Sequence, residues 1–518
     1  MAGQSETPTP QTPQTPEGSG LFERILNFIE RVGNKLPHPI ILFFILAGLT
    51  IVASWLVSAA GVTVEHPGTG ETVEAVNLIS RYGFERIVTE AVDNFVGFAP
   101  LGVVLVAMLG VGVAEKSGLI NSVLKSLILG APMKLLTVAV VLVGILSSVA
   151  TDAGYVVVVP LGAIIFAAKG RHPMVGLAAA FAGVSGGFSA NLIITSLDPL
   201  LTELTRDAAE TWVDSYPMAP SVNLWFMMAS TIIISAVGAI VTEKIVAPRF
   251  GEYTGDYKPE LEPLNNQEKS GIKAAVITLI ILLALLLVMA VPADGLLRDD
   301  EGSLTSMQAP LMGGMVPIIM VLFLLPGIAY GYAAKTVKNS TDVAKYMSEA
   351  MSDMGGYVAL AFAAGQFVKY FEWSQIGTIL AVAGADFLQA IEFTGIPLLI
   401  AFVIVAGFIN LFVGSASAKW AIMAPVFVPM FMELGYAPEL TQMAYRVGDS
   451  VTNIITPLMP YFAVIIAFAK RFDEKVGIGT LISTMLPYSI VFLITWTIML
   501  ILWYALNLPI GPGGQMFV

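Results

Sequence analysis

Residues 444–457 read AYRVGDSVTNIITP, a string in which Arg446 and Asp449 stand shortly before a helix-breaking proline, Pro457. The surrounding sequence is strongly apolar, and an ionisable side chain at membrane depth costs at least ~2.5–3.5 kcal/mol on insertion scales. Interrupted backbone at that depth is tolerated only where it is buried or lines a cavity. The string therefore predicts a broken helix that carries functional charges inside a membrane protein.

A related string lies in the first half of the chain. SANLIIT at 189–195 aligns with VTNIIT at 451–456, which pairs Asn191 with Asn453 at an offset of 453 − 191 = 262 residues. Each string follows a long apolar stretch with a polar middle, and the two polar middles are separated by a similar offset. The aligned strings and the polar middles are thus repeated at nearly the same separation along the chain, which indicates an internal duplication.

The two apolar stretches, at 134–168 and 396–433, are too long for a single membrane crossing, which needs about 20 residues. Cations flank the first stretch and carboxylates flank the second, so each is expected to enter and leave on one side. We expect re-entrant hairpins with polar tips at membrane depth, SSVATD at 147–152 and GSASAKW at 414–420. Because one hairpin enters from each side, the duplication is an inverted repeat, which is typical of transporters.

The composition agrees with a membrane protein. Of the 518 residues, 56% are hydrophobic and 12% are charged, about half the charged fraction of a soluble domain. With 26 Lys and Arg against 38 Asp and Glu, the sequence offers no basic patch for nucleic acid, and the absence of cysteine excludes disulfides and thiolate sites. The sequence contains no G-x-x-x-x-G-K-[ST] loop, so secondary transport is favoured over ATP-driven transport. No enzymatic activity is expected.

The predicted fold class is an all-α polytopic membrane protein with nine transmembrane helices, two re-entrant hairpins and broken helices at the midplane. The spans are expected at 40–62, 94–115, 172–204, 222–243, 271–293, 309–332, 355–372, 438–468 and 480–507. Lysine-rich loops place the N-terminus in the cytoplasm and the C-terminus in the periplasm. Segments 340–354 and 374–390 are less apolar and are expected to be helices at the membrane interface.

The same pattern divides the chain into segments. They are a disordered tail at 1–20, a first span with an external segment at 21–93, repeat 1 at 94–246, a linker with two spans and an interfacial helix at 247–354, repeat 2 at 355–508 and a tail at 509–518.

Charged residues at the two breaks are the first candidates for a functional site. Asp198 precedes a proline where the first broken helix restarts, and it is either an N-cap or a charge used in transport. Arg446 and Asp449 are three residues apart on one helix face. They could neutralise each other, or Arg446 could bind a carboxylate while Asp449 takes a proton or a cation. Pro438 is expected to start this helix and Pro457 to break it.

Polar and aromatic residues complete the candidate set. Ser148 and Ser417 lie at the two tips, where hydroxyls satisfy loose backbone groups or bind a substrate or a hard cation. Asn191 and Asn453 occupy matching breaks, which favours one shared site at the midplane. Trp420 could stack on an aromatic substrate or could be a packing residue.

Three strings resemble the p-aminobenzoyl-glutamate transporter family of AbgT type: AGVSGGFSANL at 182–192, GSASAKWA at 414–421 and AYRVGDSVTNIITP at 444–457. Likenesses at 36–39 and 110–119 extend the resemblance over nearly the whole chain. The resemblance implies a homodimer in the bacterial inner membrane, with nine spans and two opposed hairpins in each subunit and an aqueous basin facing the cytoplasm.

It also implies transport of p-aminobenzoyl-glutamate and, in some members, proton-driven export of sulfonamides that resemble p-aminobenzoate, which confers drug resistance. The family's functional positions match at Asp198, Ser417, Trp420, Pro438, Arg446, Asp449 and Pro457. Asn410 and Asp449 match positions associated with a sodium ion, and no other cofactor is expected. Lys419 departs from the family, whose members often have a neutral amide there. This cation could favour an anionic substrate or could snorkel into the basin.

Both arguments lead to alternating access, in which Arg446 neutralises a substrate carboxylate while Asp449, with Asp198, changes charge with the coupling ion. Two other hypotheses stay open. A sodium-coupled carboxylate symporter would share the hairpin design and work as an importer. A non-transporting membrane protein, such as a receptor, would not need polar tips and matched breaks at the midplane.

Overall fold

The computed structural model describes most of the chain. The described residues are 37–65, 72–130, 132–150, 154–213, 215–253, 263–304, 308–457, 459, 461–473 and 476–518. The tail predicted at 1–20 and the acidic residue of the first tip, Asp152, lie outside them.

The described residues are predominantly helical, as predicted, and their only sheet pairs β1 (Thr63–Glu65) antiparallel with β2 (Thr72–Glu74). Five helices are long and apolar enough to cross a membrane: α2 (Pro39–Ala59), α11 (Leu224–Val241) with its continuation through η5 (Thr242–Val246) into α12 (Ala247–Phe250), α13 (Asn266–Ala290), α15 (Met315–Ala334) and α23 (Ile478–Ala505). Counting the bent pair α5 (Ala99–Lys116) and α6 (Leu119–Leu129), which meet at 61°, adds a sixth. The all-α membrane class is confirmed, and the count of nine spans stays a prediction.

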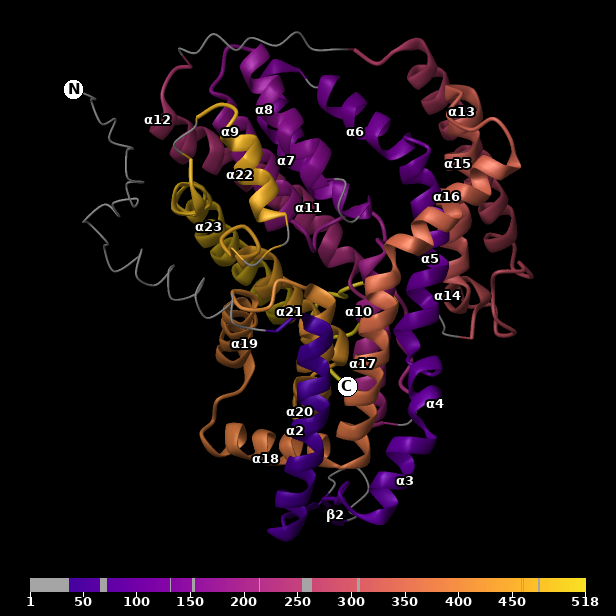
Figure 1. The fold of residues 1–518 in the computed structure, drawn as a ribbon, viewed down its shortest axis with the longest axis vertical. Coiled ribbons are helices and arrows are strands. Elements are labelled where there is room, and N and C mark those ends of the chain that lie inside the picture. Colours follow the sequence, from indigo (N-terminus) through magenta and orange to yellow (C-terminus); the bar gives the residue numbers. More distant parts are fainter. Residues whose placement is uncertain are drawn as a thin grey trace, which may run out of the picture.

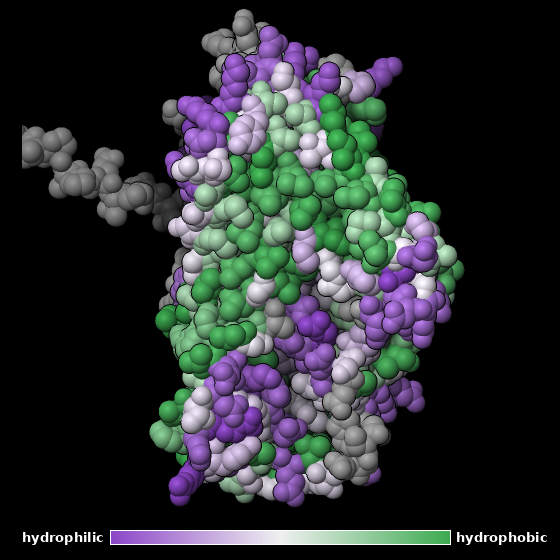
Figure 2. All heavy atoms as spheres, turned by 90° about the vertical axis from the view of Figure 1, so that its right-hand side faces the viewer, coloured by the Kyte–Doolittle hydropathy of each residue, from purple (hydrophilic) through white to green (hydrophobic). Residues whose placement is uncertain are grey.

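The molecule has two polar ends separated by an apolar surface. In Figure 1, α6, α8, α9 and α12 lie toward one end and α3, α18 and β2 toward the other. Figure 2 shows hydrophobic residues gathered in a band, with hydrophilic residues above and below it. On α13 the side chains of Ile280, Leu287 and Val288 are exposed. A large exposed apolar surface of this kind suits contact with lipid rather than with water.

Two helical hairpins form where the sequence predicted them. The first consists of the short turn η1 (Met133–Leu135), α7 (Leu136–Leu146), the 3-10 turn η2 (Ser147–Ala150), the π-turn η3 (Gly154–Val158) and α8 (Val159–Ala168). The second consists of α19 (Gly395–Asn410) and α20 (Ala416–Glu433). The described residues next to both tips are irregular or in 3-10 and π-turns, and such backbone must find partners inside the protein.

Two broken helices follow the hairpins. α9 (Pro173–Phe181) and its π-turn η4 (Ala182–Gly186) end before a non-helical segment, and α10 (Leu197–Glu210) continues beyond it. In the second half, α21 (Pro438–Thr452) gives way to turns before α22 (Phe462–Ala469). The order of hairpin, helix, break and helix is therefore the same in both halves of the chain.

Shorter helices complete the described fold. They are α3 (Arg81–Thr89), α4 (Ala91–Val96), α14 (Pro310–Gly313), α16 (Ser340–Asp353), α17 (Gly355–Trp373) and α18 (Ile376–Ala390). Two of them, α16 and α18, coincide with the less apolar segments that the sequence predicted to be helical. α16 starts with a capping box in which Asn339 and Asp342 satisfy each other's backbone amides.

Helix starts explain two of the histidines. His38 and His172 each stand before a proline in the first turn of a helix, and each Nδ1 accepts a hydrogen bond from a backbone amide, that of Ile40 at 3.4 Å and that of Met174 at 3.3 Å. The proline has no N–H to satisfy, and the imidazole satisfies the next one. Both histidines therefore serve as caps.

Glycines let each hairpin approach its broken helix closely. A Cβ at Gly183 would lie 2.2 Å from the carbonyl oxygen of Val141 on α7, and one at Gly448 would lie 2.3 Å from the carbonyl oxygen of Val403 on α19. Both distances are too short for any side chain. The backbone of each broken helix thus touches the first helix of its own hairpin, as small residues allow in membrane bundles.

This contact predicts that Gly183→Ala and Gly448→Ala each destabilise the protein. Overpacking of this kind costs about 1–3 kcal/mol, so the Tm of the purified protein in detergent should fall. Gly479→Ala in α23 is the control, because no atom lies within 4 Å of the added Cβ. An equal Tm for all three variants would show that the helices separate easily at these crossings.

Candidate functional site

The two hairpin tips and the two breaks meet through matching hydrogen bonds. In the first half, Asn191 Nδ2 donates to Ser148 Oγ at 3.0 Å, and in the second half Asn410 Nδ2 donates to Asn453 Oδ1 at 2.7 Å. The partners are 43 residues apart in both cases. Both members are shifted by the same offset, since 410 − 148 and 453 − 191 both equal 262. The duplicated chain thus ties each tip to its own break at equivalent positions.

Four charged side chains are buried in the same region of the protein, and each is at most 2% exposed: Asp198, Lys419, Arg446 and Asp449. Asp198 from α10 pairs with Arg446 from α21, and Lys419 from α20 pairs with Asp449 from α21. The mutual pair of Arg446 and Asp449 considered from the sequence is not formed. One helix can present both residues on a face, but the neighbouring helices supply an opposite charge to each of them.

Lys419 does not snorkel into an aqueous basin, because its side chain is completely buried. Its ammonium group donates to Asn410 Oδ1 at 2.5 Å and to Asp449 Oδ1, and it lies 5.5 Å from the centre of the Tyr445 ring. Asn410 Nδ2 also donates to the Asp449 carbonyl oxygen and to Thr452 Oγ1. The ammonium therefore occupies the space between the two side-chain oxygens that the family resemblance connects with a sodium ion.

Asp198 is not the N-cap of α10, because the helix starts at Leu197 and Ser196 holds the cap position. Its Oδ2 nevertheless accepts hydrogen bonds from the amide and the hydroxyl of Thr195, at 2.6 and 2.8 Å. Oδ1 faces Arg446. The Asp198 carboxylate thus stabilises the start of α10 and also neutralises the positive charge of Arg446 on α21.

Trp420 is fully buried and packs its indole against Tyr445, with ring centres 4.4 Å apart and an angle of 28° between the planes. Its Nε1 donates to Thr205 Oγ1 on α10 at 2.9 Å. The stacking partner of Trp420 in this conformation is therefore Tyr445. Pro438 starts α21 as predicted, and Pro457 lies in the following break.

The sequence analysis missed a polar face on α21. Residues at spacings of three and four share this face and are all buried: Glu439, Gln442, Arg446, Asp449 and Asn453. Neither amide atom of Gln442 has a hydrogen-bond partner within the described part of the chain. The periodicity of three and four was the signal that could have revealed the whole face.

The segment between α10 and α11 contacts this face at the N-terminal end of α21. Tyr216 Oη donates to Glu439 Oε2 at 3.2 Å, and Asn223 links the Glu439 carbonyl oxygen to Arg446 Nη1. Burial, with the neighbouring Glu439 carboxylate, raises the pKa of the Tyr216 phenol above its ordinary value. Tyr216 therefore stays a neutral donor at physiological pH.

A cavity of about 310 Å³ lies between the two tips and the two breaks. Ser148, Ser417 and Asn453 line it from the predicted site, together with the aromatic rings of Tyr155, Tyr357 and Tyr461 and with Val104, Met108, Phe188, Ser196, Leu197, Leu200, Met354, Gly414, Ser415, Ala416 and Met459. Asn191, Asp198, Trp420, Arg446 and Asp449 are not in its wall. The predicted residues therefore form two layers, an inner polar wall and a charged layer behind it.

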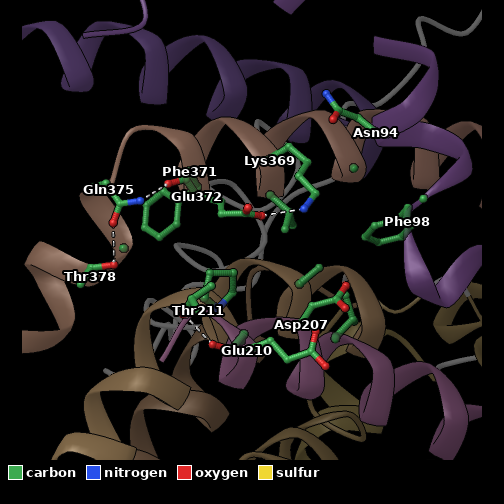
Figure 3. Close-up of a pocket in the computed structure, with 18 of the residues that line it drawn as sticks. Asn94, Phe98, Asp207, Glu210, Thr211, Lys369, Phe371, Glu372, Gln375 and Thr378 are labelled. Atoms are coloured by element: carbon green, nitrogen blue, oxygen red, sulfur yellow. Dashed lines mark hydrogen bonds and ion pairs between the residues drawn. The ribbon is translucent and has the colours of Figure 1, made fainter. Parts of the chain in front are cut away.

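A larger cavity of about 670 Å³ opens between α10, α17 and α18. Figure 3 shows Lys369 and Glu372 of α17 facing it from one side and Asp207 and Glu210 of α10 from the other. A constriction of about 10 Å³, which is lined mainly by apolar side chains, lies between the two cavities. It shares Leu200 with the smaller cavity and Leu204 with the larger one. The small space therefore adjoins both cavities.

The pairing of charges predicts the outcome of double-mutant cycles. Asp449→Asn or Lys419→Gln alone leaves a buried charge without its partner, and breaking such a pair costs about 3–5 kcal/mol. The double variant should lose less than the sum, when unfolding is followed in detergent. A cycle of Arg446→Gln with Asp449→Asn should show less coupling. Stronger coupling there would mean that Arg446, and not Lys419, neutralises Asp449.

Comparisons with known proteins agree with this architecture. Residues 24–518 match the model of a family described as the "AbgT putative transporter family". The p-aminobenzoyl-glutamate transport protein of Escherichia coli strain K12 is 36% identical over 490 residues, which is 95% of this chain and 96% of that protein.

Two solved structures are also similar. The YdaH transporter of Alcanivorax borkumensis, described as having an unusual topology, is 43% identical with a TM-score of 0.87 and covers 92% of this chain and 100% of its own. MtrF of Neisseria gonorrhoeae, described as illuminating a class of antimetabolite efflux pumps, is 46% identical with a TM-score of 0.89 and covers 95% of this chain and 100% of its own.

Proposed function

Because the chain belongs to the AbgT transporter family and is a multi-pass membrane transporter, we propose that it carries p-aminobenzoyl-glutamate and related aromatic carboxylates, including p-aminobenzoate. It exports sulfonamide antimetabolites in exchange for protons and so confers drug resistance. The relative named for p-aminobenzoyl-glutamate and the similarity to an antimetabolite efflux pump support these substrates.

The observation that carries the proposal is the cavity between the two tips and the two breaks. Its volume of about 310 Å³ is at the lower end of the range for small-molecule sites. Tyrosine rings offer flat apolar walls to an aromatic ring, and the hydroxyl of Ser417 offers a hydrogen bond, whereas the Ser148 hydroxyl already donates to the Ile145 carbonyl oxygen and accepts from Asn191. Such a site suits a molecule with one aromatic ring and polar groups at its ends.

The charged layer supplies the coupling. Arg446 binds the substrate carboxylate once the pair with Asp198 opens, since a guanidinium matches a carboxylate with two parallel hydrogen bonds. Asp449 Oδ2 is buried and has no hydrogen-bond partner among the described residues. An ionised carboxylate accepts a hydrogen bond from the aromatic amine that p-aminobenzoate and sulfonamides share, whereas a protonated one is a poorer acceptor. Proton and substrate then compete, as exchange requires.

The constriction gives the alternating step. The small, mainly apolar space beside both cavities is the proposed gate, to which Leu200 and Leu204 contribute from one turn of α10. Connecting the smaller cavity with the larger one requires α10 and α20 to separate. Each of these helices carries one partner of a buried ion pair with α21. Gating and charge neutralisation are therefore linked.

The protein works as a homodimer surrounded by lipid in the bacterial inner membrane. The end of the molecule that carries α6 and α12 faces the cytoplasm, because Lys125 and Arg249 lie on these helices and positive loops are retained inside. By the same rule the N-terminus is cytoplasmic and the C-terminus periplasmic.

Efflux of labelled p-aminobenzoate from proteoliposomes with an imposed pH gradient tests this function. The wild-type protein should show gradient-driven efflux, and Asp449→Asn should reduce it at least ten-fold because the proton no longer competes with the substrate. Asp386→Asn on the exposed face of α18 is the matched control and should keep wild-type efflux.

Two other results would replace the proposal. Flux that follows an imposed sodium gradient and is inhibited by succinate would identify a sodium-coupled carboxylate importer. Equal pH-driven efflux by wild-type protein and Asp449→Asn would remove Asp449 from the coupling step.

A further inference from the structure

The position between Asn410 and Asp449 is already occupied by a cation of the protein itself. Lys419 Nζ donates to Asn410 Oδ1 and to Asp449 Oδ1, and the exposed fraction of the lysine side chain is 0%. The aliphatic part of the side chain is buried as well, so the ammonium is not reaching out of the protein. A metal ion bound by the same two oxygens would have to displace it.

Hydrogen bonds fix the orientation of the Asn410 amide. Its Nδ2 carries two hydrogens and lies within hydrogen-bond distance of three acceptors, the Asp449 carbonyl oxygen at 2.7 Å, Thr452 Oγ1 at 2.8 Å and Asn453 Oδ1 at 2.7 Å. Its Oδ1 is therefore turned away from these acceptors and toward the lysine. Hard cations bind through several oxygen atoms at once. Here Asn410 Oδ1 and Asp449 Oδ1 already accept hydrogen bonds from the ammonium. Of the side-chain oxygens of these two residues, only Asp449 Oδ2 is without a partner among the described residues, and one free oxygen does not suffice for a sodium ion.

The charges of the cluster lead to the same conclusion. Asp198 and Asp449 carry two negative charges, and Arg446 and Lys419 carry two positive charges, in two separate ion pairs. The cluster is thus neutral without any bound ion. A sodium ion added beside Lys419 would leave a net positive charge in a place without solvent, and burying an uncompensated charge is strongly unfavourable.

We propose that Lys419 is a tethered cation that holds the sodium position between Asn410 and Asp449, so that this chain binds no sodium ion there. With respect to transport, which rests on the proposed function, the consequence is coupling that does not need Na⁺. A neutral residue at position 419 would leave the oxygens of Asn410 and Asp449 facing an empty position. A sodium-binding site is therefore one substitution away.

Thermal unfolding of the purified full-length protein tests the proposal without any transport assay. The Tm of wild-type protein should be the same in NaCl, KCl and choline chloride of equal ionic strength. Lys419→Gln removes the ammonium and adds a carbonyl oxygen. Its Tm should be lower than that of wild type in KCl and should rise by several degrees in NaCl, with saturation, because a ligand that binds only the folded state stabilises it.

Two controls define the site. Lys369→Gln on α17 removes a lysine that pairs with Glu372 beside the larger cavity, and its Tm should not depend on sodium. Adding Asn410→Leu to Lys419→Gln should abolish the sodium effect, because one ligand oxygen is lost. A folded Lys419→Gln protein whose Tm is insensitive to sodium would overturn the proposal.

The wild-type measurement decides the matter even if Lys419→Gln does not fold. A saturable increase in the Tm of wild-type protein that is specific for Na⁺ would overturn the proposal, and an identical Tm in the three salts supports it.

Transport separates this proposal from the proposed function. Efflux of p-aminobenzoate driven by a pH gradient should be equal in sodium-free and sodium-containing buffers. Efflux that requires Na⁺ would overturn the proposal and leave a transporter. If wild-type protein shows no efflux in either buffer, the proposed function fails, whereas the Tm comparison still decides whether Lys419 takes the place of sodium.

Discussion

Two ion pairs without access to solvent constrain this structure most strongly. Removing one partner of such a pair leaves a buried charge, so each of the four residues must have a partner of opposite charge or be neutralised in any stable conformation. Both pairs use α21, which receives Asp198 from the first broken helix and Lys419 from the second hairpin. The pair of Asp198 with Arg446 consequently holds the two halves of the duplicated chain together, whereas the pair of Lys419 with Asp449 lies within the second half. The surrounding apolar helices alone would associate only through packing.

This arrangement makes α21 the element on which any conformational change must act. A rigid α21 that carries Arg446 and Asp449 one turn apart cannot move away from both α10 and α20 unless each pair finds a new partner. Under the proposed function, a substrate carboxylate would replace Asp198 as the partner of Arg446, and a proton would neutralise Asp449. The two ion pairs that stabilise this conformation are thus the interactions that a substrate and a coupling ion would replace in the proposed function. Glu439 and Gln442 extend the polar face of α21 toward the outer end of the helix, which keeps this helix polar along its length.

Sequence patterns predicted the architecture because they depend on local or repeated signals. The lengths of the apolar stretches, their polar middles and the alignment of Asn191 with Asn453 each follow from the chain read in order. The ion-pair partners were not predictable in this way. Spacing along one helix suggests an ion pair between Arg446 and Asp449. In the structure Arg446 pairs with Asp198, 248 residues away, and Asp449 pairs with Lys419, 30 residues away. Long-range packing also placed Trp420 against Tyr445 and buried Lys419, and neither contact leaves a trace in local periodicity.

The duplication itself separates what the fold needs from what the charges add. The bond between hairpin tip and break is present in both halves, as Ser148 with Asn191 and as Asn410 with Asn453. Shifting by 262 residues, the positions equivalent to Lys419, Arg446 and Asp449 are Val157, Val184 and Gly187. The first half therefore forms the same hairpin and the same broken helix without charges at these positions. Because the first half forms without them and because buried charges are costly, Lys419, Arg446 and Asp449 are better explained by the proposed transport role than by a need of the architecture.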